Sequence, residues 1–172
     1  MKVESWTQLH DVVVTSAVGL FTSIGLSAVY GGSAPKVDGE LSETLSIIGF
    51  AGQLRGCLVL SVPTTLLERS LPSGAKESAD VTDWLTELAN LLLGRIKIRL
   101  LTRGVTTELS TPLTLSATTI QLVGFSGMPI AHSFHVGSQT IYVVFGAMAS
   151  DDLCLIPSTE QSIVRMGDIV MF

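Results

Sequence analysis

The chain is poor in basic residues. Its 172 residues include ten Lys and Arg against fifteen Asp and Glu, which gives a formal net charge of -5. Proteins that hold nucleic acid by its phosphates need clustered positive charge, so nucleic-acid binding is not expected. Charged residues make up only 15% of the chain and hydrophobic residues 47%, a balance that argues against intrinsic disorder. The acidic balance suits a partner that exposes Lys or Arg.

Cysteine is almost absent. Cys57 and Cys154 lie far apart and show neither CxxC nor Cys/His ligand spacing. A disulfide framework is therefore not indicated and a reducing compartment fits, although the sequence leaves a bond between these two cysteines open. His132 and His135 are three residues apart in a predicted strand, so they should point to opposite faces of a sheet. We expect no metal site.

The chain also lacks a convincing membrane span. Residues 12–29 are uncharged, but Ser and Thr recur through them and two glycines interrupt them. A spanning helix needs about 20 predominantly apolar residues, and a signal peptide needs a basic start. Here Lys2 is followed by Glu4 and Asp11. We therefore predict a buried amphipathic helix and a cytoplasmic protein without membrane contact.

The chain length fits one domain, residues 1–172, with a sizeable core. It divides into two similar halves, about 1–75 and 76–172, each of which begins with a long helical pattern and continues into strands. In the first half we expect a helix at 5–28 ended by the breaker cluster 31–35, a hairpin of strands at 43–50 and 54–62, and a short helix at 64–71.

In the second half we expect a helix at 81–101, capped by Asp80 and ended by Gly104, and strands at 106–109, 113–122, 130–136, 140–147 and 163–171. Gly137 and Ser138 predict a tight turn between two of these strands. Helices combined with hairpin-connected strands predict an α+β fold. In this fold, long helices pack on one face of a mainly antiparallel sheet.

One face of the predicted second-half helix is polar. At about 100° per residue, Asp83, Glu87 and Asn90 fall within roughly 60° of one another, and Gly94 completes the stripe. The opposite face is apolar and contains Val81, Leu85, Leu88 and Leu92. Any solvated helix face has this polar composition, so periodicity alone assigns no function. Asn and Gly are poor mid-helix residues, Gly by about 1 kcal/mol relative to Ala, which favours a function.

The first-half helix lacks this stripe if Gly94 is aligned with Gly25. The residues aligned with the three polar positions are then Val14, Val18 and Phe21. On this alignment only the second half has polar side chains that could take part in a reaction. Gly94 has no side chain, so the surface of another molecule could approach closely there.

The pattern Asp83-x3-Glu87-x2-Asn90, with Pro112 22 residues later, resembles the motif of the CheC/CheX family of chemotaxis phosphatases. That motif is an Asp or Ser, then Glu, then Asn on a long helix, with a proline just over twenty residues beyond. The spacing here is one residue short before the proline. The hairpin at 48–60 resembles the first hairpin of the family, and the single motif is more similar to CheX than to the two-site CheC.

The resemblance implies that the long helix lies against the phosphorylated face of a CheY-type receiver domain. Glu87 would pair with the active-site lysine of the receiver, and Asn90 would hold a water in line with the acyl phosphate. Asp83 would contact the partner at the rim, and Gly94 would let it approach. The receiver would supply Mg²⁺, so this chain would bind no cofactor. The resemblance also implies a homodimer through sheet edges, and the apolar strand at 141–145 would need such protection.

Two alternatives stay open. The chain could be a non-enzymatic module of the same fold, which docks a receiver or another signalling partner without hydrolysis. It could also be a scaffold that only oligomerises. The sequence does not name the target receiver.

Overall fold

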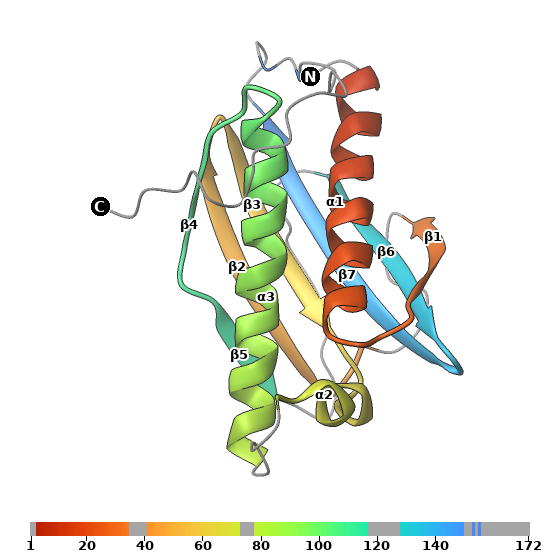
Figure 1. Ribbon diagram of the computed structural model, residues 1–172. Coiled ribbons are helices and arrows are strands. Elements are labelled where there is room, and N and C mark those ends of the chain that lie inside the picture. Colours follow the sequence, from red (N-terminus) through yellow and green to blue (C-terminus); the bar gives the residue numbers. More distant parts are fainter. Residues whose placement is uncertain are drawn as a thin grey trace.

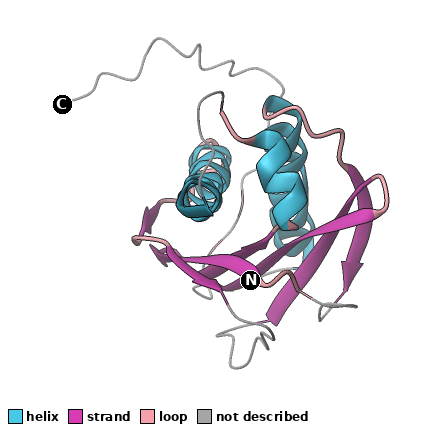
Figure 2. Ribbon diagram, turned by 90° about the horizontal axis from the view of Figure 1, so that it is seen from below, coloured by secondary structure: helices cyan, strands magenta, loops and turns pink. Residues whose placement is uncertain are grey.

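Two long antiparallel helices lie side by side on one face of a single sheet (Figures 1 and 2). In this computed structural model the described residues are 3–34, 41–72, 78–116, 128–149, 153 and 155. The helices are α1 (Val3–Ser23), the short α2 (Thr64–Ser70) and α3 (Ser78–Leu101). Among the described residues, no helix is long and apolar enough to cross a bilayer.

The sheet is antiparallel at every pairing of its described strands, in the order β1-β6-β7-β3-β2-β4, with β5 also paired to β2. The strands are β1 (Val29–Ala34), β2 (Thr44–Gly52), β3 (Leu54–Ser61), β4 (Thr107–Leu109), β5 (Leu113–Ser116), β6 (Met128–Val136) and β7 (Gln139–Ala149). The predicted α+β fold, with helices on one face of an antiparallel sheet, is confirmed.

The two halves exchange their edge strands. β1 of the first half pairs with β6 of the second, while β4 and β5 of the second half pair with β2 of the first. The central pair, β3 and β7, joins the halves across eight residue pairs. Each half therefore completes the sheet of the other, and the described strands of both halves form one sheet. A single domain over residues 1–172 stays a prediction.

The apolar face of each long helix is buried against this sheet. On α3, Leu85, Leu88, Leu92 and Ile96 have no exposed surface. They recur at three- and four-residue intervals, which places them on one side of the helix. Each buried leucine contributes about 1.5–3 kcal/mol relative to an exposed one. This burial fixes which face of α3 points outward.

The predicted end of the first helix was wrong. α1 ends at Ser23, because Gly25 adopts a left-handed φ of 78° and the amide of Leu26 donates to the carbonyl of Phe21 at 2.9 Å. The supposed breaker residues 31–34 instead lie in the edge strand β1. Glycine leaves room within this strand for a neighbouring side chain, since the ring of His135 occupies the place of a Cβ at Gly31.

Two further predictions were wrong. Asp80 is not the cap of α3, which begins two residues earlier at Ser78, so Asp80 lies in the first turn. Residues 141–145 do not form an edge, because β7 lies inside the sheet between β3 and β6. The available edges are β1 on one side and β4 with β5 on the other. The homodimer and the cytoplasmic location stay predictions.

The remaining elements agree with the prediction where they are described. The hairpin β2–β3, the helix α2 and the turn at Gly137, with φ of 62°, are confirmed. Residues 117–122 and 163–171, predicted as strand, lie outside the described residues, and so does Cys154. Cys57 is half-buried in β3, and burial raises the pKa of its thiol.

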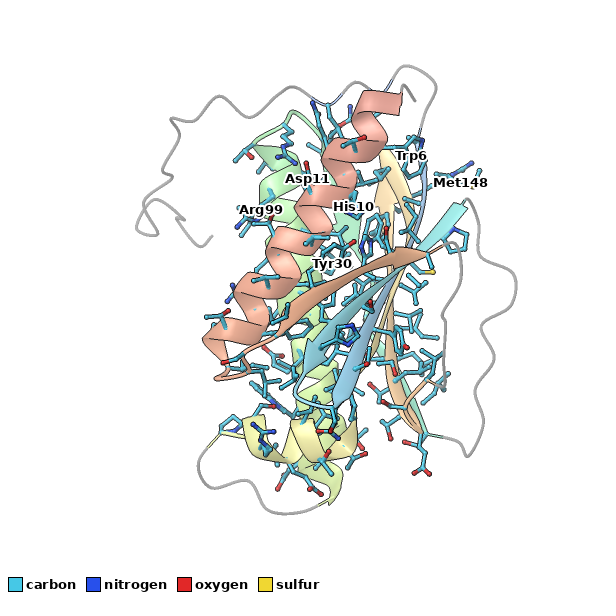
Figure 3. The ribbon with its side chains drawn as sticks, turned by 90° about the vertical axis from the view of Figure 1, so that its right-hand side faces the viewer. Trp6, His10, Asp11, Tyr30, Arg99 and Met148 are labelled. Atoms are coloured by element: carbon cyan, nitrogen blue, oxygen red, sulfur yellow. The ribbon has the colours of Figure 1, made fainter. Side chains whose placement is uncertain are left out.

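A buried histidine lies between α1 and the sheet. His132 of β6 is 1% exposed, whereas His135 is exposed on the other face, as their spacing predicted. The ring of His10 is 4.9 Å from that of His132 and lies within 3.3 Å of the Tyr30 hydroxyl (Figure 3). Nδ1 of His132 has no hydrogen-bond partner among the described residues. Burial, with a smaller effect from His10, lowers the pKa of His132 to about 4.

This pKa predicts a pH-dependent loss of stability. The unfolded chain binds a proton at His132 below pH ~6.5, while the folded chain resists it until about pH 4. The free energy of unfolding is therefore not reduced by this histidine above pH ~6.5, and it decreases as the pH falls towards 4. We expect His132→Phe to reduce the loss in free energy of unfolding between pH 7 and 5 by about 1–2 kcal/mol. Denaturant unfolding at both pH values measures this loss, with His135→Phe as control. An unchanged loss in His132→Phe would show that His132 is not buried in its neutral form.

Candidate functional site

The polar stripe predicted from the sequence lies on the side of α3 opposite its buried leucines, which is the outward face of the helix. Asp83 and Glu87 are exposed, while Asn90 and Gly94 are half-buried. Within the described part of the chain, no hydrogen bond or ion pair engages the side chains of Asp83, Glu87 or Asn90. The carboxylate and the amide are therefore free to meet a second molecule.

A chain of hydroxyl groups holds α3 against the sheet beside Glu87. Thr86 Oγ1 donates to the carbonyl of Thr82 at 2.9 Å and lies 2.6 Å from Thr114 Oγ1 on β5. Thr114 Oγ1 in turn donates to Ser46 Oγ on β2 at 3.2 Å. These contacts lie on the sheet side of the helix, so they limit the rotation of α3 at the level where Glu87 projects outward.

The position of Pro112 follows from the path of the chain. α3 runs one way, and the β4–β5 segment returns beside it in the opposite direction (Figure 1). The helix rises ~16 Å from Asn90 to Leu101, and the extended chain descends ~16 Å from Thr107 to Pro112. We therefore expect Pro112 to lie level with Asn90, which gives a physical reason for the spacing of just over twenty residues.

Basic residues join the two long helices. Arg95 Nη2 donates to Ser23 Oγ at 3.0 Å, and Arg103 Nη1 donates to the carbonyl of Gln8 at 3.1 Å. Burial lowers the pKa of Arg103, Asp11 opposes this shift, and Arg99 adds to it. Arg95 of α3 and Arg103, two residues beyond its end, thus connect this part of the chain to α1.

The helix ends correct the predicted alignment of the halves. Gly25 and Gly104 share a left-handed φ of 78°. The amide of Val105 donates to the carbonyl of Leu100 at 3.0 Å, as that of Leu26 does to Phe21 at 2.9 Å. These identical caps align residues 79 positions apart. The alignment of Gly94 with Gly25 was therefore wrong, because Gly94 lies inside a helix and caps nothing.

With this alignment the first helix carries a polar stripe of its own, which the sequence reasoning missed. The residues aligned with Asp83, Glu87 and Asn90 are Glu4, Gln8 and Asp11. The carboxylate of Glu87 is thus aligned with the amide of Gln8, and the amide of Asn90 with the carboxylate of Asp11. The signal available in the sequence was the pair of capping glycines, Gly25 and Gly104.

The two stripes also differ in their surroundings. On α1, Gln8 is half-buried, its Oε1 is buried without a described partner, and its carbonyl accepts from Arg103. Arg103 also interacts with the Asp11 carboxylate. The residue aligned with Arg103 in the first half is Ile24, which carries no charge. The α1 stripe therefore lies beside a cation of the same chain, whereas the α3 stripe has no described polar partner.

Comparison with solved structures identifies the fold as CheC-like. A chemotaxis protein CheX from Desulfovibrio desulfuricans superposes with a TM-score of 0.72 at 18% identity, covering 82% of this chain and 99% of that chain. A CheC-like superfamily protein from Shewanella sp. PV-4 gives 0.71 at 20% identity, with coverage of 87% and 100%. The CheX–CheY–BeF3–Mg²⁺ complex from Borrelia burgdorferi gives 0.66 at 11% identity, with coverage of 80% and 96%.

The sequence itself places the chain in a family. A family model described as chemotaxis phosphatase CheX matches residues 44–131, about half of the chain, and this match contains all of α3 and Pro112. The chain therefore belongs to the CheX family of chemotaxis phosphatases. A comparison with curated protein sequences gives no match.

An exposed stripe should tolerate substitution without loss of stability. We expect Glu87→Ala and Asn90→Ala to change the free energy of unfolding by no more than about 0.5 kcal/mol, since neither side chain has a described partner. Leu88→Ala, on the buried face of the same helix, should cost about 2–5 kcal/mol. Denaturant unfolding measures all three. A loss above about 1 kcal/mol in Asn90→Ala would assign that side chain a structural role.

Proposed function

We propose that this chain accelerates hydrolysis of the aspartyl phosphate on a phosphorylated CheY-type receiver domain. The observation that carries the proposal is a free carboxylate and a free amide, Glu87 and Asn90, three residues apart on the outward face of α3. Membership of the CheX phosphatase family supports it. A relative of the same fold is known in complex with CheY, BeF3 and Mg²⁺, which supports a receiver as partner.

Glu87 has the task of holding the receiver. Its exposed carboxylate can form a charge-assisted hydrogen bond with a lysine of the receiver's active site. Side chains at i and i+3 on a helix have Cβ atoms about 5–6 Å apart, so a receiver held by Glu87 lies within reach of Asn90. Asp83, one turn earlier and also exposed, meets the rim of the same partner.

Asn90 has the task of positioning water. Its amide oxygen can accept a hydrogen bond from the attacking water while its NH₂ group donates to a phosphoryl oxygen. Water attacks phosphorus, the bond from phosphorus to the carboxyl oxygen breaks, and the products are inorganic phosphate and the free aspartate of the receiver. The leaving carboxylate needs no protonation and Mg²⁺ comes with the receiver, so positioning is the main contribution required of this chain.

Replacement of the amide should remove the acceleration. We expect Asn90→Ala to lower the added rate of phosphate release by about 100-fold or more, because the water loses its alignment. The assay mixes the protein with a receiver phosphorylated by acetyl phosphate in Mg²⁺ and follows inorganic phosphate. Asp11→Ala, at the aligned position of α1, is the matched control and should keep the wild-type rate.

The same assay separates catalysis from docking. Binding of the phosphorylated receiver by the wild-type protein without any change in its dephosphorylation rate would identify a non-enzymatic module. Wild-type acceleration by Asn90→Ala would exclude the role of its amide.

A further inference from the structure

The outward stripe of α3 continues beyond the polar residues and becomes apolar. Leu91, Ile98 and Leu101 are 39%, 53% and 57% exposed, whereas most large apolar side chains of the helix are buried. At about 100° per residue, Ile98 and Leu101 fall within roughly 60° of Glu87 and Gly94, on the same side of the helix. The free carboxylate and amide are therefore continuous with an exposed apolar surface.

Gly94 forms a notch in this surface. A Cβ added at Gly94 would meet no atom within 4 Å, so the interior of the protein does not require glycine there. Glycine is a poor residue for the middle of a helix, and its φ here lies outside the left-handed region. Leu91 and Ile98 are its neighbours at three and four residues, so their side chains border the space that Gly94 leaves open. Packing within the described chain therefore does not explain the glycine at position 94, whereas the close approach of another molecule would.

The size of a protein interface supports the same conclusion. One side of a standard interface covers about 800 Å², a patch ~30 Å across, whereas the polar stripe from Asp83 to Asn90 is only ~10 Å long. α3 begins five residues before Asp83 but continues for eleven residues after Asn90. A partner centred on the polar stripe must therefore extend over the apolar half of the helix.

We infer that the receiver domain places an apolar side chain in the notch at Gly94, between Leu91 and Ile98, and that this contact sets its affinity. The inference rests on the proposed function, because it takes the receiver as the partner of α3. An anchor in a small apolar pocket beside a charged contact is typical of the residues that dominate binding energy. Leu91, Gly94 and Ile98 thus select the partner, while Glu87 and Asn90 act on its phosphate.

Filling the notch tests the inference. Gly94→Leu should raise the Kd for a CheY-type receiver phosphorylated by acetyl phosphate at least tenfold, with the loss of activity appearing in KM. Its thermal unfolding midpoint should stay at or above that of the wild type, since leucine is the better helix former. Thr15→Leu is the matched control, because Thr15 is exposed and occupies the aligned position on α1.

Removal of the apolar border gives a second test. Ile98→Ser should also raise the Kd for the phosphorylated receiver, by about tenfold or less. The control is Val29→Ser, a change of an even more exposed aliphatic residue on β1, at the other edge of the sheet. Unchanged receiver affinity in Gly94→Leu would overturn the inference.

Other outcomes are equally decisive. If sedimentation shows a wild-type dimer that Gly94→Leu dissociates while receiver affinity stays constant, a second copy covers this face and the inference is wrong. If the wild type binds the phosphorylated receiver without speeding phosphate release, and Gly94→Leu still abolishes binding, the docking inference stands while the proposed catalysis fails.

Discussion

The burial of one side of α3 against β2 and β3 determines what the other side can do. Leu85, Leu88, Leu92 and Ile96 lose all exposure on the sheet, and the hydroxyl contacts of Thr86 fix the helix at the same level. A helix held in this way cannot rotate without exposing several leucines, each worth about 1.5–3 kcal/mol. The polar residues on the far side are therefore held outward on a rigid support.

Such rigidity matters for a reaction that depends on positioning. A helper that only aligns water has little chemistry of its own, so its effect depends on how well its side chains are held relative to the partner. Placing a carboxylate and an amide on one helix, rather than on loops, keeps them at a fixed separation. The notch at Gly94, one turn further on, lies on the same rigid face.

The internal repeat shows how one of two similar surfaces is kept free. The halves exchange edge strands and end their long helices with the same glycine cap. They differ at one aligned position: Arg103 of the second half lies beside the α1 stripe, whereas the aligned residue of the first half is the uncharged Ile24. The α1 stripe therefore has a cation of the same chain beside it. Asp83, Glu87 and Asn90 on α3 have no polar partner among the described residues.

Local patterns predicted much of this structure, but tertiary arrangements could not be predicted in the same way. The faces of α3 follow from helical periodicity, and the β2–β3 hairpin follows from two apolar runs around a turn. The place of β7 inside the sheet depends on pairings between distant segments. The edge strand β1 was missed because it is rich in glycine, and the polar stripe of α1 was missed because Gly94 was mistaken for an equivalent of Gly25. The capping glycines Gly25 and Gly104 were visible in the sequence, but the positive φ that they share was not.

The most direct test of the account is the rate of phosphate release from a phosphorylated receiver in the presence of Asn90→Asp. This change keeps the size of the side chain, but a carboxylate cannot donate to a phosphoryl oxygen and repels it. The account predicts that the variant keeps its fold and loses the acceleration. An Asn90→Asp protein that hydrolyses the acyl phosphate as fast as the wild type would contradict it.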